Sequence, residues 1–448
     1  MLGELGTIKT GKTPASSLGD GFGGTVPFVT PGDMNGQKWI TDTDRCLNER
    51  GLASVSSSLM PPRSVAVSCI GSDMGKASLL SRPSVTNQQI NTIAVDESRF
   101  NAEFVYYDLS VRQQELKAAA SGSATPILNK GHFSAFEISI PPRATQDKIA
   151  EILGKLDDRI AVNRRINQTL EAMAQAIFQS WFVDFDPVKA KIAAKAEGRD
   201  PLRAAMSAIS GKAGAELDAL PPEQYEQLAA TAALFPDEME ESEVGEVPKG
   251  WSVGTLSNFA SFQNGYAFKT KDWTDSGHPV VKIGNVKPGI IDLSGCSLVA
   301  HETVNGLDRF ALKKGDLLVG MTGYVGETGL VPALYSVAYL NQRVGRISTV
   351  NGVSDIGYPF CLVRDPAYKA YAESKAHGSA QANVSGKDLM DYQAVVPDAG
   401  VLKIFNAQVA KIINALLSYH EENQSLAALR DTLLPRLLSG ELLVADAM

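Results

Sequence analysis

The chain has 448 residues, of which 44% are hydrophobic and 21% are charged, and its formal net charge is −8. This composition is typical of a globular protein with two to four domains, and no apolar run approaches the ~20 residues that a membrane span needs. The four cysteines, Cys46, Cys69, Cys296 and Cys361, form no C-x-x-C pair, which argues against structural disulfides or a zinc site and favours the cytoplasm.

The negative charge is unevenly distributed. Ten acidic residues and no Lys or Arg lie between Ala215 and Val247, so removing this segment from the net charge of −8 leaves +2 for the remainder. An acidic segment beside nearly neutral modules is compatible with a polyanionic partner such as a nucleic acid.

Residues 1–143 have the pattern of a mixed β and loop domain. Short β-type runs, such as Val26–Val29 and Ser64–Ile70, alternate with turns rich in Gly and Pro. A long helix is expected over residues 144–183, after Pro141-Pro142, with Thr145 as its N-cap.

The second half of the chain is expected to repeat this order. Residues 184–250 are predicted to form an Ala/Lys-rich and then acidic linker, since Asp186-Pro187 ends the first helix. A second mixed domain is expected over residues 251–397 and a second long helix over 398–442, with a short tail at 443–448.

The two expected helices have matching seams, mostly of apolar residues, at an offset of 256 residues. Their steps of mainly three and four residues are those of a coiled coil. The seam of the first helix comprises Ile149, Leu153, Leu156, Ile160, Asn163, Asn167, Leu170, Ile177 and Trp181. The seam of the second comprises Phe405, Val409, Ile412, Leu416, Tyr419, Asn423, Leu426, Leu433 and Leu437.

The mixed domains also share short matched segments at offsets of 252 to 256 residues, with almost unrelated sequence between them. The matched pairs are Val26–Val29 with His278–Val281, Gly71 with Gly323, Asn87–Ile90 with Asn341–Val344, and Gly122–Ala124 with Gly378–Ala380. We therefore expect an internal duplication in which one scaffold carries two different surfaces.

The predicted fold is α+β. Two similar mixed β/α domains are separated by two long antiparallel coiled-coil helices and are related by a pseudo-twofold axis. Each helix leaves an apolar seam that the other can cover. Asn167 and Asn423 interrupt the seams at equivalent places, where a buried Asn could fix the register, although an exposed polar break is the other interpretation.

One nucleotide-binding motif is present by sequence alone. Gly6–Thr13 matches G-x-x-x-x-G-K-T, but the phosphate-binding loop follows a buried strand and opens a helix. Only five residues precede Gly6, and Pro14 with several glycines follows, so a strand and a turn are expected instead. No nucleophile elbow, H-E-x-x-H motif or His cluster is evident, and no metal site is predicted.

The remaining candidates are polar loop residues that could hydrogen-bond base edges or hold phosphates. The first domain offers Lys9, Lys12, Arg63, Ser72, Lys76, Gln88 and Gln89. The second offers Lys269, Lys271, Lys282, Asn285, Tyr324, Gln342, Arg343 and Gln381. Asn87-Gln88 and Asn341-Gln342 recur in both halves, which favours a scaffold role for them and base reading for their divergent neighbours.

The whole chain resembles a specificity subunit of a type I restriction–modification system. The resemblance rests on the duplicated order of domain and helix, on Thr145–Val188, on LLPRLLSGEL at Leu433–Leu442, and on GEVPKGW at Gly245–Trp251.

The resemblance implies a non-catalytic, DNA-binding subunit. Each mixed domain would be a target recognition domain reading one half of a bipartite, asymmetric double-stranded DNA sequence, and the helices would set the gap between the halves. Two modification subunits would dock on the chain and supply S-adenosylmethionine for adenine-N6 methylation. Two restriction subunits would add ATP- and Mg-dependent translocase and nuclease activity. The chain itself would bind no cofactor.

Two alternatives are open at this point. The chain could be an enzyme, either a nucleotide hydrolase or a self-contained restriction–modification protein. It could also be a coiled-coil adaptor for proteins only, which explains the helices but gives the two diverged domains no purpose.

Overall fold

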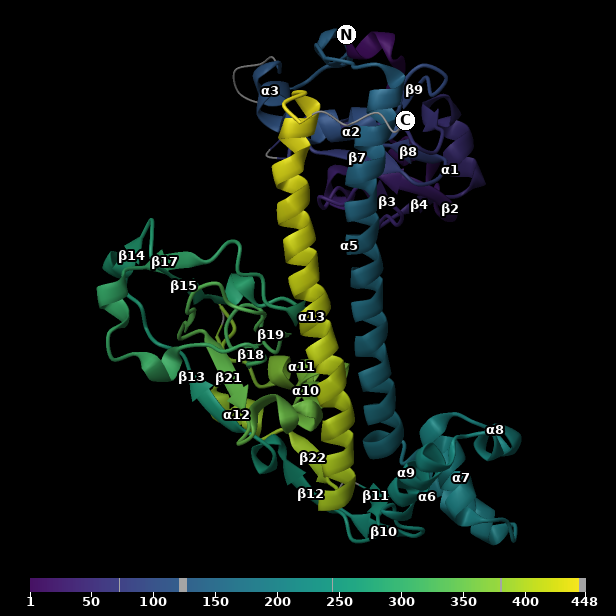
Figure 1. Ribbon diagram of the computed structural model, residues 1–448, viewed down its shortest axis with the longest axis vertical. Coiled ribbons are helices and arrows are strands. Elements are labelled where there is room, and N and C mark those ends of the chain that lie inside the picture. The colour runs from purple at the N-terminus through teal and green to yellow at the C-terminus, as the bar shows by residue number, and fades with distance from the viewer. Residues whose placement is uncertain (72, 121–126, 244, 379–380, 443–448) are drawn as a thin grey trace. The chain divides into compact units, whose positions relative to one another are not determined.

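The computed structural model describes residues 1–71, 73–120, 127–243, 245–378 and 381–442. The chain forms two compact units, one of Met1–Ala161 with Gln424–Met448 and one of Val162–Asn423. Two long helices, α5 (Arg143–Phe178) and α13 (Ala399–Leu438), each contribute one part to each unit (Figure 1). The division between the two compact units therefore falls within both long helices.

The first unit contains a five-stranded sheet in the order β1-β9-β6-β7-β3 and a four-stranded sheet in the order β4-β2-β8-β5. The strands of the first sheet are β1 (Gly6–Thr10), β9 (Ile90–Val95), β6 (Val65–Ser68), β7 (Ala77–Leu80) and β3 (Trp39–Ile40). Those of the second are β4 (Cys46–Leu47), β2 (Phe22–Val29), β8 (Ser84–Thr86) and β5 (Leu59–Met60). Every residue of β6 is buried, and β6 is the central strand of its sheet.

The second unit repeats the five-stranded sheet in the same order, β13-β21-β18-β19-β16. These strands are β13 (Ser261–Asn264), β21 (Val344–Ser348), β18 (Leu317–Gly320), β19 (Thr328–Leu330) and β16 (Gly289–Ile290). Its four-stranded sheet has the order β14-β17-β15-β20, with β14 (Trp273–Thr274), β17 (Ser297–Val299), β15 (His278–Val281) and β20 (Tyr339–Leu340).

The strand pairings confirm the internal duplication and the α+β class. β2 is parallel to β8 and antiparallel to β4, and β15 is parallel to β20 and antiparallel to β17 in the same way. Only the fourth strand differs, since β5 lies beside β8 whereas β14 lies beside β17. The two units therefore share one arrangement of strands and differ in an edge strand of the four-stranded sheet.

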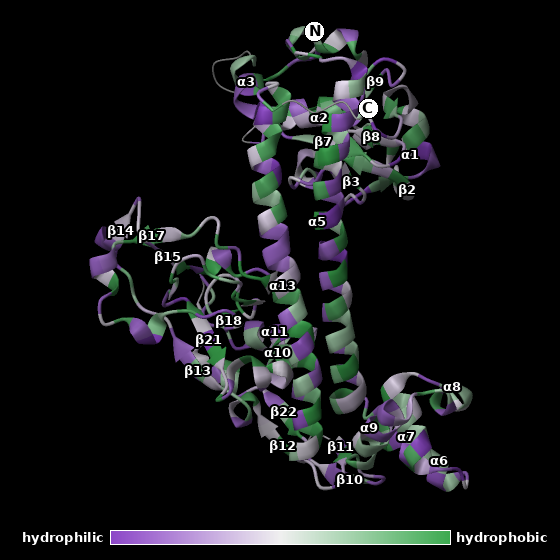
Figure 2. Cartoon of the chain, viewed as in Figure 1, coloured by the Kyte–Doolittle hydropathy of each residue, from purple (hydrophilic) through white to green (hydrophobic). Residues whose placement is uncertain are grey.

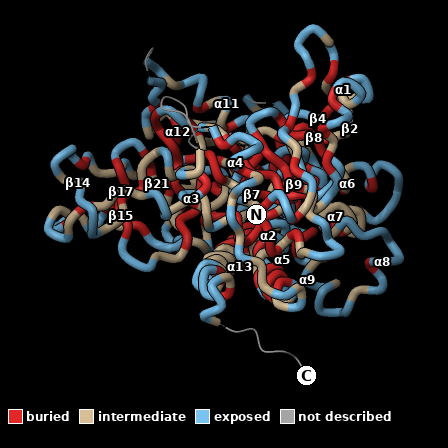
Figure 3. Tube along the Cα trace, turned by 90° about the horizontal axis from the view of Figure 1, so that it is seen from above, coloured by how far each residue is buried: buried red, intermediate tan, exposed pale blue. Residues whose placement is uncertain are grey.

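Short helices accompany both sheets. The first unit has α1 (Glu49–Ser54), α2 (Ala102–Val111), α3 (Gln113–Ala118) and α4 (Lys130–Ala135), and the second has α10 (Gly357–Arg364), α11 (Pro366–Ser374) and α12 (Gly386–Met390). Phe104 and Tyr107 of α2 share a buried core with strand β6 and with Ile149 and Leu153 of α5. Figure 3 shows this buried material around β7 and β9, with exposed loops outside it.

The long helices are antiparallel within each unit. In the first unit, Asp157 of α5 pairs with Arg430 of α13, and Ile149 lies in one core cluster with Leu437. In the second unit, Asn163 contacts Asn423. Residue numbers thus rise along one helix as they fall along the other, and Figure 2 shows hydrophobic and hydrophilic residues alternating along both helices.

The buried face of α13 differs from the predicted seam. Phe405, Val409, Ile413 and Leu417 are fully buried in the core of the second unit, whereas Ile412, a predicted seam residue, is only partly buried. Steps of four residues replace the coiled-coil alternation, because this helix packs against the sheet domain as well as against α5. In the first unit Leu434 is likewise more buried than the predicted Leu433.

The polar contacts between the helices also differ in detail from the expected asparagine pair. Asn423 accepts a hydrogen bond of 3.0 Å from the Asn163 side chain, and Asn163 is completely buried. Asn167 instead donates to the carbonyl oxygen of Leu416 at 3.1 Å. The predicted N-cap at Thr145 is wrong, because α5 already begins at Arg143.

The segment expected as a linker is folded. It forms α6 (Asp186–Ala196), α7 (Pro201–Ser210), α8 (Gly214–Asp218), α9 (Pro222–Ala233) and the hairpin β10 (Met239–Ser242) with β11 (Gly245–Pro248). Ala205, Met206, Leu217 and Ala232 form a small core of their own. The acidic residues are compatible with this fold because they lie on its surface, where some of them form local ion pairs, as Asp218 does with Arg203 at 2.8 Å.

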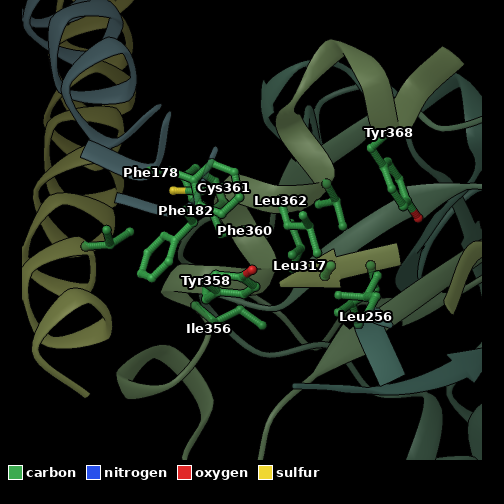
Figure 4. Packing of buried hydrophobic residues seen from close by; sticks show 14 of the residues in the cluster. Phe178, Phe182, Leu256, Leu317, Ile356, Tyr358, Phe360, Cys361, Leu362 and Tyr368 are labelled. Atoms are coloured by element: carbon green, nitrogen blue, oxygen red, sulfur yellow. The ribbon is translucent and has the colours of Figure 1, made fainter. Parts of the chain in front are cut away.

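Aromatic side chains pack together in the core of the second unit at the C-terminal end of α5. The π-helical turn Gln179–Val183 follows α5, and the Phe182 ring lies 4.8 Å from that of Phe405 and 4.9 Å from that of Tyr358, edge to face. Figure 4 shows Phe178, Phe182 and Tyr358 pointing toward one another. These contacts join α10, the C-terminal part of α5 and the N-terminal part of α13 in one core.

Helix α13 is the one described helix that is long and apolar enough to cross a membrane by length and composition. Its buried residues Phe405, Val409 and Ile413 belong to the core of the second unit. This packing accounts for its apolar composition.

Candidate nucleic-acid interface

In the first unit, β8 and β9 are joined by a turn whose two central residues are Gln88 and Gln89. Hydrogen bonds fix the backbone of this turn. The Asn87 amide N–H donates to the Val29 carbonyl oxygen at 2.8 Å, and the Ile90 N–H closes the turn on the Asn87 carbonyl oxygen at 3.2 Å. The Asn87 Oδ1 accepts from the Gln89 N–H at 3.0 Å. The Gln89 carbonyl oxygen accepts from the Cys69 N–H at 2.7 Å.

The turn between β20 and β21 has the same frame in the second unit. The Asn341 N–H donates to the Val281 carbonyl oxygen at 3.2 Å, and the Val344 N–H donates to the Asn341 carbonyl oxygen at 2.9 Å. The Asn341 Oδ1 accepts from the Arg343 N–H at 3.3 Å. The Arg343 carbonyl oxygen accepts from the Met321 N–H at 3.0 Å.

A glycine packs against each turn. A Cβ on Gly11 would lie 2.1 Å from the Asn87 carbonyl oxygen, and one on Gly265 would lie 2.1 Å from the Asn341 carbonyl oxygen. Only glycine permits such a close approach of two backbones. Together with the buried Asn87 and Asn341, these glycines give the recurring residues a structural role.

The side chains that the turns present to solvent differ between the units. We define the first turn surface as Lys12, Thr13, Gln88 and Gln89, and the second turn surface as Tyr324, Gln342, Arg343 and Gln381. Thr13 Oγ1 lies 2.5 Å from Gln88 Oε1 in the first. In the second, Arg343 Nη1 donates to Gln381 Oε1 at 3.2 Å, and Tyr324 is 63% exposed.

Sequence reasoning missed two neighbours of these surfaces. Thr13 belongs to the first, and Asn383 accepts a hydrogen bond of 2.6 Å from Thr322 Oγ1 beside the second. Their closeness to Gly11 and Gln381 in the chain was the available signal. Ser72, another candidate, lies outside the described residues.

The other candidates of the first unit have partners within their own domain. Lys9 Nζ donates to the Ser57 carbonyl oxygen at 2.7 Å, and Lys76 pairs with Asp73 at 2.8 Å. Arg63 has a φ of 63°, a costly conformation for a residue other than glycine.

Two carboxylates hold Arg63. Its guanidinium pairs with Glu97 at 2.8 Å and with Glu103 at 2.9 Å. Burial opposes the charge, but the hydrogen bonds that the guanidinium donates to these two carboxylates raise the pKa of Arg63 above its usual value. The Arg63 guanidinium is therefore committed to contacts inside its domain.

Four candidates of the second unit flank strands of its four-stranded sheet, Lys269 and Lys271 before β14 and Lys282 and Asn285 after β15. Lys282 Nζ donates to Ser297 Oγ at 2.7 Å and lies 3.5 Å from the centroid of the Trp273 ring. Burial lowers the pKa of Lys282. Asn285 accepts from the Lys282 N–H at 3.0 Å, which is a turn contact, whereas Lys269 and Lys271 are exposed.

The segment with the nucleotide-binding motif is a strand and a turn. Gly6–Thr10 is the edge strand β1. The Gly11 N–H donates to the Ile90 carbonyl oxygen at 3.0 Å, and the Lys12 N–H donates to the Thr86 carbonyl oxygen at 2.9 Å. Backbone donors that a phosphate-binding loop would direct at its ligand are thus already used.

The duplicated frame has known counterparts. The family model described as "Type I restriction modification DNA specificity domain" matches residues 1–172 and 248–427. The specificity subunit of the type I restriction enzyme HindI from Haemophilus influenzae is 33% identical over 72% of this chain and 73% of its own length. The MjaIX specificity subunit from Methanocaldococcus jannaschii is 21% identical over 99% of this chain and 93% of its own.

A solved structure extends the likeness to the fold. The crystal structure of the type I restriction–modification S subunit from M. genitalium aligns with a TM-score of 0.50 and 15% identity, covering 100% of this chain and 96% of that one. The two matches to the family model fall on the two repeated domains with the helices that follow them. The chain therefore belongs to the family of type I restriction–modification specificity subunits.

Proposed function

We propose that the two turn surfaces each contact one half of a bipartite, asymmetric double-stranded DNA target. The observation that carries this proposal is the repeated backbone frame with divergent side chains. A common frame places each surface in the same way against a duplex, and different side chains select different bases. Lys12 would add a phosphate contact, which fixes position without reading sequence.

The long helices would set the gap between the half-sites. α5 has 36 residues, which corresponds to a length of ~54 Å at ~1.5 Å per residue. That length equals ~16 base pairs at ~3.4 Å each. Because the pairing of the two helices would be fixed, the gap between the two half-sites would have a constant length.

The partners would be two modification subunits and two restriction subunits. The modification subunits would bring S-adenosylmethionine and flip the target adenine out of the duplex for methylation at N6. ATP and Mg would be bound by the restriction subunits. This chain would supply specificity and docking surfaces, without a cofactor of its own, in the cytoplasm.

An exchange of domains tests the assignment of half-sites. Residues 1–143 are replaced by the first domain of another specificity subunit, and the methylated sequence motif is mapped after co-expression with the modification subunits. One half of the motif should change while the other half and the gap persist. A change in both halves, or in neither, would contradict the proposal.

An insertion tests the spacing role separately. Four residues are added to α5 after Ala161 and four to α13 after Asn423, so that the pairing of the helices stays matched. Four residues lengthen a helix by ~6 Å and turn it by little more than one full turn, so the gap should grow by about two base pairs with both half-sequences unchanged. Equal insertions into an exposed loop serve as the control, and an unchanged gap would refute the spacing role.

A further inference from the structure

The equivalent positions Gln89 and Arg343 carry different side chains on one backbone frame. Each is the second residue of its two-residue turn, and its N–H donates to the Oδ1 of the buried Asn two residues earlier. The carbonyl oxygen of each accepts the N–H of a residue just after the central strand, Cys69 or Met321. The frame therefore fixes where each side chain starts and leaves its chemistry free.

The preceding turn residue cannot supply the difference between two half-sites. Gln88 and Gln342 are the same amino acid at equivalent positions, and Gln88 is engaged by Thr13. The residue that follows, Ile90 or Val344, is buried in a strand. Within the turns, only Gln89 and Arg343 are both exposed and different.

The two side chains match different purines. A glutamine amide has one acceptor and one donor group in a plane, which fits the N6 amino group and N7 of adenine in the major groove. An arginine guanidinium has donors only, which fits O6 and N7 of guanine. The substitution of Arg for Gln in one frame therefore exchanges a complement to adenine for a complement to guanine.

Each side chain is also steadied by a polar neighbour. Gln89 Oε1 accepts a weak hydrogen bond of 3.3 Å from Asn87 Nδ2 and has a second lone pair for a base amino group. Arg343 uses Nη1 to reach Gln381 Oε1 at 3.2 Å, which keeps the Nη2 and Nε pair for a bidentate contact. Such support reduces the entropy lost when a long side chain contacts a base.

We propose that Gln89 and Arg343 are equivalent specificity-determining residues, Gln89 reading an adenine in the half-site of the first unit and Arg343 a guanine in that of the second. This inference rests on the proposed function and assigns one base in each half-site to one side chain. Loss of either contact should reduce the preference for the assigned base over the other bases by ~10- to 100-fold.

The test uses the chain assembled with its modification subunits and maps the methylated motif for the wild type, R343Q, Q89R and the double exchange. R343Q should replace guanine by adenine at one position of the second half-site and leave the first half-site unchanged. Q89R should do the reverse in the first half-site. R309Q removes the same charge from an exposed position in the second unit and serves as the control, with the wild-type motif expected.

If a variant methylates DNA poorly, its base preference is measured instead by competition binding with duplexes that differ only at the assigned base pair. R343Q should bind the adenine-substituted duplex ~10-fold or more better than the original target. An unchanged motif, a changed distant half-site, or equal weakening on both duplexes would overturn the assignment. Failure of the proposed function itself is distinguishable, because the wild-type assembly would then yield no bipartite motif at all.

Discussion

Replacing Asp157 by alanine should weaken the first unit strongly. The Asp157 carboxylate, whose side chain is 10% exposed, accepts from Arg430 Nη1 at 2.8 Å and from the Tyr107 hydroxyl at 2.6 Å. It thereby joins α5, α13 and the domain helix α2 within that unit. Burial, followed by the charge of Asp157, raises the pKa of the Tyr107 hydroxyl, so Tyr107 remains a donor at neutral pH.

The expected loss of unfolding free energy follows from the two contacts. A hydrogen bond to a charged group contributes about 1.5–3 kcal/mol, but Arg430 is 28% exposed and has Asp431 as a second partner at 2.7 Å. Arg430 therefore keeps a carboxylate in the variant, whereas the Tyr107 hydroxyl loses its acceptor. We expect D157A to cost about 3 kcal/mol.

The matched control is E151A on the same helix. Glu151 pairs with Lys155 at 2.5 Å, but both side chains are more than half exposed, so its loss should leave the stability of the first unit almost unchanged. Hydrogen exchange of the α2 amides reports the stability of the first unit directly. D157A should accelerate that exchange ~100-fold, and an effect no larger than that of E151A would refute the reasoning.

The remaining predictions concern titration and backbone packing. Burial lowers the pKa of His420 below 6.5, so the unfolded chain binds the proton more readily and stability falls as pH drops through 6.5 towards the folded-state pKa. H420Q should therefore reduce the difference in melting temperature between pH 7.5 and 5.5, and an unchanged difference would exclude His420 as its source. G11A should abolish recognition of one half-site and G265A that of the other, because each Cβ would meet a backbone carbonyl oxygen. G284A, whose Cβ would meet nothing within 4 Å, should leave the methylated motif unchanged, and equal effects of all three variants would contradict the packing argument.

Recurrence within the sequence made most of the architecture predictable. Gly11 and Gly265, with Asn87 and Asn341, repeat because their backbone contacts repeat. Such contacts tolerate almost no substitution, so they leave a signal even where the surrounding surfaces have diverged.

Contacts between distant residues were not predictable from local patterns. A heptad pattern treats α13 as half of a helix pair, and it cannot reveal that Ile413 and Leu417 turn toward a sheet domain. Composition likewise presents residues 184–250 as a linker, because the small core of Ala205, Met206 and Leu217 contains few large apolar residues.

In the candidate site, too, recurring positions could be predicted from the sequence, whereas contacts between distant residues could not. Residue type alone cannot distinguish the exposed Lys12 from Lys9, whose ammonium is bound by the Ser57 carbonyl oxygen. Nor does it reveal that Glu97 and Glu103 occupy the guanidinium of Arg63. The comparison of equivalent positions in the two halves was more informative, since it separates the shared frame from the residues that differ on it.

The most direct measurement of the central claim is the pattern of methylated adenines in cells that carry the modification subunits with and without this chain. With the chain, methylation should occur at one bipartite, asymmetric sequence with a fixed gap, and without the chain that methylation should disappear. Methylation that persists without the chain, or a single uninterrupted motif in its presence, would contradict the account.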